Sequence, residues 1–180
     1  VAEYLMESIL SGKLQPGDKI VESKLARELS ISQGAVREAI RDLIAQGVLE
    51  TEAYKGTRIR SMTKEQLTDY YKVRTEIEAV AVRWSIINHQ SRYLDLEFLK
   101  NCVDNMAACV ANNDSKLMRQ HDMLFHSTIV QSAHSDSLFR AWNSLGNYYW
   151  THIAIHYDHS ASLLPAQVVK HRTMYEAIAA

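Results

Sequence analysis

The first third of the chain alternates short helical patterns with breaks. Apolar residues recur at every fourth position in the first segment, which predicts a helix ending at Ser11-Gly12. A second short helix is predicted over residues 22–29, and Ser32 is a good N-cap for a third over residues 33–45. Two short helices joined by a tight turn are typical of a helix-turn-helix unit.

The third predicted helix has an apolar and a polar face. Its buried side is expected to consist of Val36, Ile40, Leu43 and Ile44. Another side carries Gln33, Arg37 and Arg41, which are four positions apart and therefore form one stripe. Arginine suits phosphates and guanine edges, so this stripe predicts contact with DNA. The alternative is a solvated face on which the arginines pair with Glu38 or Asp42.

Residues 48–60 have the pattern of a β-hairpin. Two strands are predicted over residues 48–52 and 57–60, joined by a turn that contains Lys55-Gly56. The segment 53–60 carries three cations and no acid, so the hairpin is expected to act as a basic wing beside the helix stripe. The predicted DNA-binding residues are Ser32, Gln33, Arg37, Arg41, Lys55, Gly56 and Arg58.

Beyond the hairpin the pattern changes to long helices. Five of the six glycines lie in the first third, and this shift predicts a DNA-binding domain over residues 1–61 and a second domain over residues 62–180. Thr63 and Gln66 fit a capping box at the start of a long helix. Its apolar stripe is expected to be Tyr70, Val73, Ile77, Val80, Trp84 and Ile87.

Further helical patterns follow to the end of the chain. One helix is expected over residues 93–112. Another follows the break and cap at residues 112–114, a third follows residues 132–137, and a last one lies in the final segment. Their expected inward residues are Phe98, Cys102, Met106, Val110, Leu117, His121, Phe125, Ile129, Leu138, Trp142, Leu145, Tyr149, Val168, His171, Tyr175 and Ile178. The predicted fold class is mainly α: a winged helix-turn-helix of three helices and a hairpin, then an all-α antiparallel helical bundle.

Composition changes this picture little. The net charge of −1 means that no overall basic field indicates nucleic acid, so the DNA prediction rests on local arrangement. Cys102 and Cys109 lie on one face of a predicted helix, and we interpret them as apolar residues in a reducing compartment. No apolar run reaches the about 20 residues that span a bilayer, and no leader is visible, so a cytoplasmic protein without a membrane partner is expected.

Three polar residues stand at core positions of the second domain. Asp122 and His126 are four residues apart on one helix, and His171 continues an inward stripe on another. A carboxylate and two imidazoles suit a divalent cation of the Zn, Ni or Mn class. The alternatives are a hydrogen-bonded core histidine and a simple Asp–His ion pair. The residues His152, His156 and His159 also share a helical face, as a polar surface or a second set of contacts to pocket or metal.

Several segments of the first domain resemble the winged helix of the GntR family of repressors. They are Leu14-Gln15-Pro16-Gly17-Asp18-Lys19-Ile20, the helix Leu25-Ala26 to Leu29, Ile31-Ser32 followed by Ala35-Val36-Arg37-Glu38-Ala39-Ile40, and Gln46-Gly47-Val48-Leu49. The resemblance implies that the partner is double-stranded operator DNA. The chain departs from the family at Gln33, where arginine is usual. Because glutamine pairs with adenine, the operator preference is expected to differ.

The second domain resembles the FCD effector domain, which defines the FadR branch of that family. The resemblance lies in Asp69–Glu78, in the D-x-x-F-H motif Asp122–His126 and in the H-R-x-x-x-x-A-I motif His171–Ile178. In metal-binding members, the Asp and His of the first motif, the His of the second and one later His hold the ion. The resemblance therefore implies Asp122, His126 and His171 as ligands, with the fourth beyond Ala180 and the last helix missing from this chain.

The resemblance also implies a small organic acid as effector, bound near the metal. Arg74 is the candidate for a second contact with this anion, and an ion pair with Glu78 or Asp122 is the alternative. The expected protein is a homodimeric transcription regulator, in the first place a repressor, whose effector changes its affinity for the operator. Rival interpretations are a helical metalloenzyme that uses the Asp/His site, a pure metal sensor and an acyl-CoA binder.

Overall fold

The computed structural model describes residues 1–87, 94–145 and 163–180. The chain falls into two compact units. Val1–Gln66 forms almost all of the first unit, and the second begins at Leu67. The division therefore lies in the first turn of the long helix α4 (Lys64–Ile87). Within the described residues, no helix is long and apolar enough to cross a membrane.

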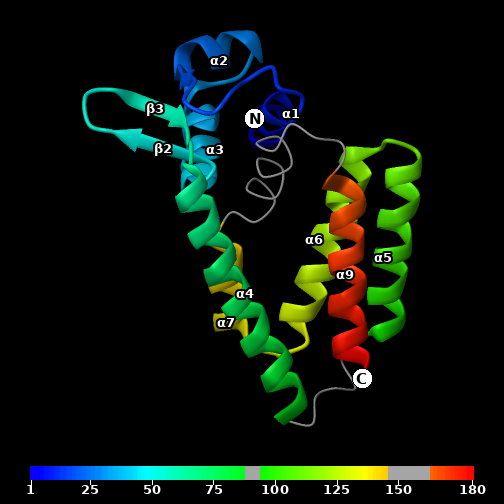
Figure 1. Ribbon diagram of the computed structural model, residues 1–180. Helices are drawn as coiled ribbons and strands as arrows, with labels where there is room; N and C mark the ends of the chain where they lie inside the picture. The colour runs from blue at the N-terminus through cyan, green and yellow to red at the C-terminus, as the bar shows by residue number, and fades with distance from the viewer. Residues whose placement is uncertain (88–93, 146–162) are drawn as a thin grey trace. The chain divides into compact units, whose positions relative to one another are not determined.

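The first unit is a winged helix-turn-helix. Its elements are α1 (Ala2–Leu10), β1 (Lys19–Ile20), α2 (Glu22–Glu28), α3 (Gln33–Ala45), β2 (Leu49–Glu52) and β3 (Gly56–Ile59), and the β2–β3 hairpin projects from the helices in Figure 1. The strands are antiparallel in the order β1-β3-β2. The sequence predicted the hairpin but missed β1, because two residues after a turn are too short for an alternation pattern.

The helices and the wing share one small core. Its most deeply buried members are Leu5, Ile9, Val36, Ile40, Leu43, Val48, Leu49 and Ile59. The predicted cap of α3 is confirmed, since the Ser32 hydroxyl accepts a hydrogen bond from the Ala35 backbone N–H at 3.2 Å. Gly47 ends this helix with φ +71°, a left-handed conformation that glycine adopts without steric cost.

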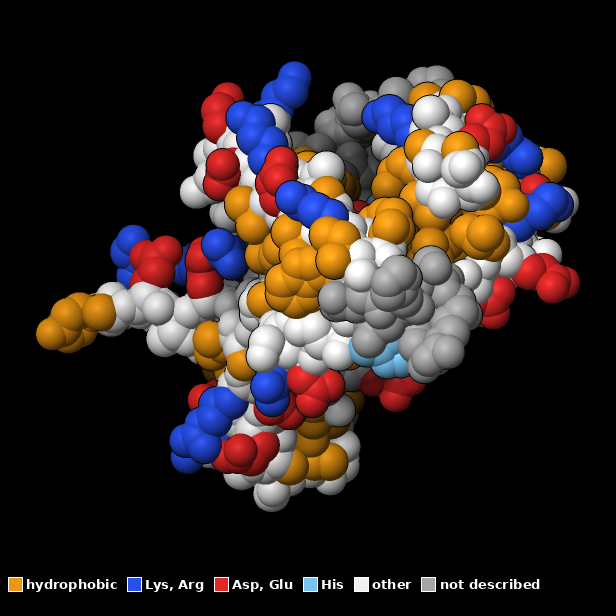
Figure 2. All heavy atoms as spheres, turned by 90° about the horizontal axis from the view of Figure 1, so that it is seen from below, with side chains coloured by type: hydrophobic (Ala, Val, Ile, Leu, Met, Phe, Trp, Pro, Cys, Tyr) orange, Lys and Arg blue, Asp and Glu red, His pale blue; other side chains and the backbone are white. Residues whose placement is uncertain are grey.

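The tip of the wing is unusually exposed. Tyr54 stands at the turn with φ +64° and is fully accessible to solvent. Figure 2 shows the hairpin as the projection on the left, ending in hydrophobic atoms, while side chains of both charges are mixed over the visible surface. The tip of the wing therefore buries no surface against the rest of the described residues.

The second unit is helical throughout its described residues. After α4 it consists of α5 (Leu96–Ala111), α6 (Ser115–Gln131), α7 (Asp136–Asn143) and α9 (Leu163–Ala179). The predicted capping box is present: Thr63 N–H donates to Gln66 Oε1 at 2.9 Å, and Gln66 N–H donates to Thr63 Oγ1 at 3.2 Å. The helices α5, α6 and α9 lie side by side in Figure 1, with α5 packed against both others.

The core of this unit lies among α4, α5, α6, α7 and α9. Its fully buried members include Leu99, Met106, Phe125, Ile129 and Trp142, and Cys102 and Cys109 are free thiols within it. Two predicted inward residues are wrong, since Phe98 and Leu117 are 38% and 42% exposed. Each lies next to a buried residue, Leu99 or Met118, so the prediction is off by one position at the start of each helix, while Cys102, Met106, Phe125 and Ile129 are buried as predicted.

The buried face of α4 also differs from the prediction. We expected the apolar stripe to pack inward, but Val73, Trp84 and Ile87 are exposed. Tyr70 of the predicted stripe is buried and Ile77 packs against the core, but the other buried residues are Arg74, Glu78, Ala81 and Ser85. Both sets recur at helical spacing, so periodicity allowed either face. Hydrophobicity missed the polar part of the buried face, because His126 and Trp142, which satisfy Glu78, lie on other helices.

Candidate functional site

Three side chains of the second unit bring potential ligand atoms to one point. Asp122 and His126 lie one turn apart on α6, and His171 comes from α9; their ligand atoms lie within 4.8 Å of one another. His171 Nε2 is 2.9 Å from Asp122 Oδ1 and 3.0 Å from His126 Nε2. All three residues are less than a tenth exposed. We call them the three-ligand cluster; the structure brings together the residues that the sequence predicted.

Both imidazoles direct Nε2 into the cluster. His126 Nδ1 lies 2.8 Å from Glu78 Oε2, and His171 Nδ1 lies 2.7 Å from the backbone carbonyl oxygen of Gln167. Because a carboxylate and a carbonyl accept, we assign the hydrogen of each ring to Nδ1. Without an ion, a proton on His171 Nε2 joins it to Asp122 Oδ1; once that proton is released, two Nε2 lone pairs and an Asp122 oxygen face one another. A divalent cation stabilises such a donor set, so the residues fit a metal ion.

Burial and neighbouring charges shift the pKa values of the three residues in different directions. Burial alone raises the pKa of the Asp122 carboxyl, but His171, His126 and Arg74 outweigh it and hold this pKa well below its usual range. Burial, with help from Arg74, lowers the pKa of His126. Burial also opposes the charge on His171, but the adjacent Asp122 carboxylate outweighs burial and raises the pKa of His171.

A buried network on α4 adjoins the cluster. Glu78 is 6% exposed; its Oε1 accepts from Arg74 Nε at 2.8 Å and from Trp142 Nε1 at 2.9 Å. Arg74 is 3% exposed, and one of its terminal nitrogens lies 3.9 Å from Asp122 Oδ2. Burial alone raises the pKa of Glu78, but His126 and Arg74 together lower it to about 2. Glu78 is therefore an ionised carboxylate at neutral pH.

Glu78 is the residue of this site that sequence reasoning did not assign. It appeared there only as a possible partner of Arg74, although the spacing of four between them places both on one helical face. The structure confirms this alternative, because Arg74 pairs with Glu78 and lies near Asp122. Contact between Arg74 and an effector remains a prediction.

The predicted DNA-binding residues of α3 lie on an exposed face. Gln33, Arg37 and Arg41 are all exposed, and Ser32 caps the helix beside them. Arg37 Nε lies 3.0 Å from Glu22 Oε2 of α2, and Arg41 pairs with Glu38 at 2.6 Å. Exposed pairs of this kind contribute about 0–1 kcal/mol, so a phosphate can replace the carboxylate at little cost.

The predicted wing residues differ in their exposure and in the contacts that they make within the unit. Lys55 is exposed and pairs with Glu52. Arg58 is half-buried and donates to the backbone carbonyl of Gly17 at 3.1 Å. Gly56 has φ +83°, and a Cβ added to it would lie 3.4 Å from Cε of Lys19, so the lysine side chain passes beside the wing turn.

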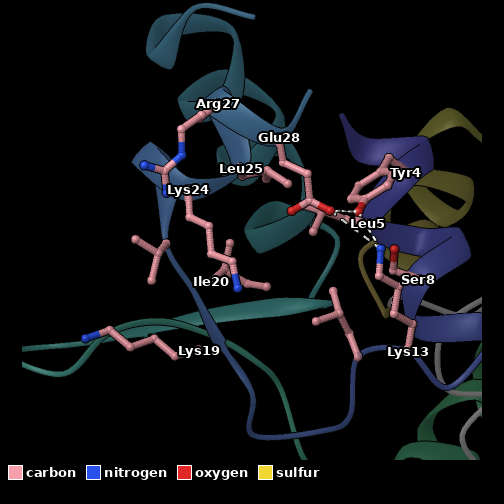
Figure 3. Close-up of a pocket in the computed structure, with 12 residues that line it drawn as sticks. Tyr4, Leu5, Ser8, Lys13, Lys19, Ile20, Lys24, Leu25, Arg27 and Glu28 are labelled. Atoms are coloured by element: carbon pink, nitrogen blue, oxygen red, sulfur yellow. Dashed lines mark hydrogen bonds and ion pairs between the residues drawn. The ribbon is translucent and has the colours of Figure 1, made fainter. Parts of the chain in front are cut away.

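A groove of about 560 Å³ lies between α1, α2 and β1, and several cations line it. In Figure 3, Tyr4, Lys13 and Glu28 meet at one end: Lys13 Nζ donates to Tyr4 Oη at 2.7 Å, and Tyr4 donates to Glu28. The cations Lys19, Lys24 and Arg27 form no salt bridge with any residue that the structure describes. Sequence reasoning missed this basic groove, because the three cations are spread over two elements.

Two further predictions concern residues that are not described. His152, His156 and His159 lie outside the described residues, and so does Tyr149. The fourth ligand that the resemblance implied would lie beyond Ala180. The three-ligand cluster is the group of three or more potential ligands found among residues 1–87, 94–145 and 163–180.

Comparison with known proteins identifies two domain families in the chain. Residues 1–59 match the family described as "Bacterial regulatory proteins, gntR family", and residues 69–180 match the FCD domain. A DNA-binding winged helix followed by this effector domain defines a class of transcriptional regulators rather than enzymes. The chain belongs to the GntR family, in the FadR-like branch that carries an FCD domain.

Individual relatives agree with this assignment. The chain is 31% identical over 146 residues to the "Probable D-xylose utilization operon transcriptional repressor" of Paenarthrobacter nicotinovorans, covering 81% of this chain and 63% of that protein. It is 30% identical to the "Gluconate operon transcriptional repressor" of Bacillus licheniformis, covering 81% and 58%. The chain thus spans about three fifths of the length of these relatives.

A solved structure has the same fold. A GntR regulator from Rhodococcus sp. RHA1 superposes with a TM-score of 0.76 at 23% identity, covering 99% of this chain and 84% of that one. At this identity the likeness supports the fold: a winged helix-turn-helix with a three-stranded wing, followed by a helical FCD bundle.

Proposed function

We propose that the chain provides the DNA-binding and sensing parts of a homodimeric transcriptional repressor. Residues 1–61 bind a near-palindromic operator, and residues 62–180 bind a small organic acid at a divalent metal ion of the Zn, Ni or Mn class. The names of the two relatives support a repressor of sugar or sugar-acid operons. Such a protein acts on chromosomal DNA, which places it in the cytoplasm.

The DNA-binding part of the proposal rests on the exposed face of α3 and on the wing. Gln33, Arg37 and Arg41 face the major groove, and Lys55, Gly56 and Arg58 contact the backbone beside it. Lys19 adds a phosphate contact, because its side chain runs beside Gly56. A homodimer places two such helices in successive grooves, and the exposed apolar residues Val73, Trp84 and Ile87 of α4 support a contact between subunits.

The single observation that carries the sensing proposal is the buried convergence of the three-ligand cluster. Two imidazole nitrogens and a carboxylate oxygen leave further coordination positions to a fourth ligand or an effector. A bound ion supplies concentrated positive charge that attracts a carboxylate. The protein's own residues orient the ligands and exclude water from the site, while Arg74 is proposed to help neutralise the effector.

The DNA proposal is tested by fluorescence anisotropy with duplexes from the region upstream of the protein's own gene. We expect tight binding to one fragment and a steep loss of affinity as salt rises, since each phosphate contact releases counterions. Binding to unrelated duplex should be orders of magnitude weaker. Absence of salt-sensitive binding to every upstream fragment would rule out the operator-binding role.

The sensing proposal is tested by metal content and by thermal shift. After gel filtration, the wild type is expected to retain one divalent ion per chain, while His126→Ala loses it and the matched control His121→Ala, on the same helix, keeps it. Two sugar acids, gluconate and galactonate, are then compared with D-xylose as a neutral sugar, a choice guided by the names of the xylose and gluconate repressors. Stabilisation by D-xylose but by neither acid would refute the organic-acid effector.

A further inference from the structure

Glu78 joins three helices of the second unit through one carboxylate. Its Oε1 accepts from Arg74 on its own helix α4 and from Trp142 on α7. Its Oε2 faces Nδ1 of His126 on α6 at 2.8 Å. The side chain is 8% exposed, so water replaces none of these partners easily. Oε1 therefore accepts from Arg74 and Trp142, while the described partner of Oε2 is His126.

The orientation of His126 depends on this contact. A neutral imidazole carries one hydrogen, and donation from Nδ1 to Glu78 leaves the Nε2 lone pair directed into the three-ligand cluster. Histidines that bind metals commonly donate the other ring N–H to a carboxylate, which fixes both tautomer and ring orientation. For His171 the corresponding acceptor is the backbone carbonyl oxygen of Gln167, which a side-chain substitution leaves in place.

We propose that Glu78 is the positioning residue of the three-ligand cluster: it fixes His126 with Nε2 toward the ion and makes α4 part of the metal site. The proposal rests on the proposed metal function. Its consequence is that α4 and α6 would be held together more firmly when the site is loaded, because a metal-bound His126 would donate a stronger Nδ1–H hydrogen bond to Glu78. α4 directly follows the wing in the chain, so a metal-dependent response of the DNA-binding unit would pass through this helix.

The substitution Glu78→Gln separates positioning from packing. The glutamine oxygen is expected to keep the Arg74 and Trp142 bonds, because both groups donate, and its NH₂ then faces His126 Nδ1. That nitrogen must now accept, so the hydrogen moves to Nε2 and points into the cluster. The variant can thus fold with its hydrogen bonds satisfied while presenting a donor to the ion. The matched control is Glu76→Gln, an exposed acid on the same helix.

The affinity of each protein for Zn²⁺ is measured by competition with a chelator. We expect Glu78→Gln to lose about 10- to 100-fold, the effect typical of the partner behind a ligating histidine, and Glu76→Gln to match the wild type. Imidazole ¹⁵N NMR of chelator-treated protein should show the Nδ1–H tautomer of His126 in the wild type and the Nε2–H tautomer in Glu78→Gln. A purely structural role would not reverse the tautomer.

Each outcome decides the proposal. Unchanged Zn²⁺ affinity in a folded Glu78→Gln variant would overturn it. An Nε2–H tautomer of His126 in the wild type would also overturn it, and this measurement needs no variant to fold. If the wild type and His126→Ala bind Zn²⁺ equally, the proposed metal function itself fails, which is a different result from loss of the Glu78 effect alone.

Discussion

The buried guanidinium of Arg74 allows a direct test of how the second unit is held together. Arg74→Met keeps much of the apolar stem and removes the charge that pairs with Glu78 at 2.8 Å and lies 3.9 Å from Asp122. Both carboxylates stay buried, so the substitution leaves uncompensated negative charge. Removing one partner of a buried pair costs about 3–5 kcal/mol. For a unit of this size the melting temperature is expected to fall by roughly 10–20 °C.

The assay is urea unfolding followed by circular dichroism, with a chelator present so that bound metal adds no stability. The double variant Arg74→Met/Glu78→Gln should recover part of the loss, because glutamine removes the stranded charge while its oxygen still accepts from Trp142 and its NH₂ faces His126 Nδ1. Recovery would locate the effect in the pair rather than in the volume of the side chain.

Two results would refute this reasoning. A loss below about 1 kcal/mol in Arg74→Met would mean that the pair behaves like an exposed one. A double variant as unstable as the sum of both single variants would mean that the two residues are not coupled. If Arg74→Met proved stable and instead weakened effector binding, the effector contact predicted from the sequence would be its main role.

Three further predictions concern DNA binding and local structure. Arg37→Ala should weaken binding to DNA and reduce the slope of log affinity against log salt by about 1, whereas Arg83→Ala on α4 should not; equal slopes would exclude a phosphate contact. Gly47→Ala should lower the free energy of unfolding by about 1–2 kcal/mol, because φ is +71° and the new Cβ would lie 3.2 Å from Arg60; an unchanged urea midpoint would contradict this. Thr63→Ala should cost about 1 kcal/mol by removing the cap, and Thr63→Ser should restore it.

Local signals in the sequence were sufficient for much of the fold. The cap at Ser32 and the capping box at Thr63 are set by neighbouring residues, and the structure contains both. The residues Asp122 and His126 could be paired from their spacing on one helix. His171 was placed with them by its inward phase and by the resemblance, since nothing local connects α9 to α6.

What the sequence did not reveal depends on contacts between distant elements. The short strand β1 exists because β3 pairs with it, and two residues carry no pattern of their own. The buried face of α4 is polar because His126 and Trp142, on other helices, satisfy Glu78. A prediction based on hydrophobicity therefore placed Val73, Trp84 and Ile87 inward and missed the buried polar residues of α4 that meet the candidate site.

α4 is one continuous helix, so any change in its length rotates one of its ends relative to the other about the helix axis. Its start is fixed by the Thr63 cap, and its charged face is fixed by Glu78 further along the same helix. One residue inserted between Gln66 and Tyr70 would turn the capped end by about 100° about the helix axis, whereas seven residues would add two turns and nearly restore the direction. Insertions of different length should therefore impair regulation periodically, not in proportion to the distance added.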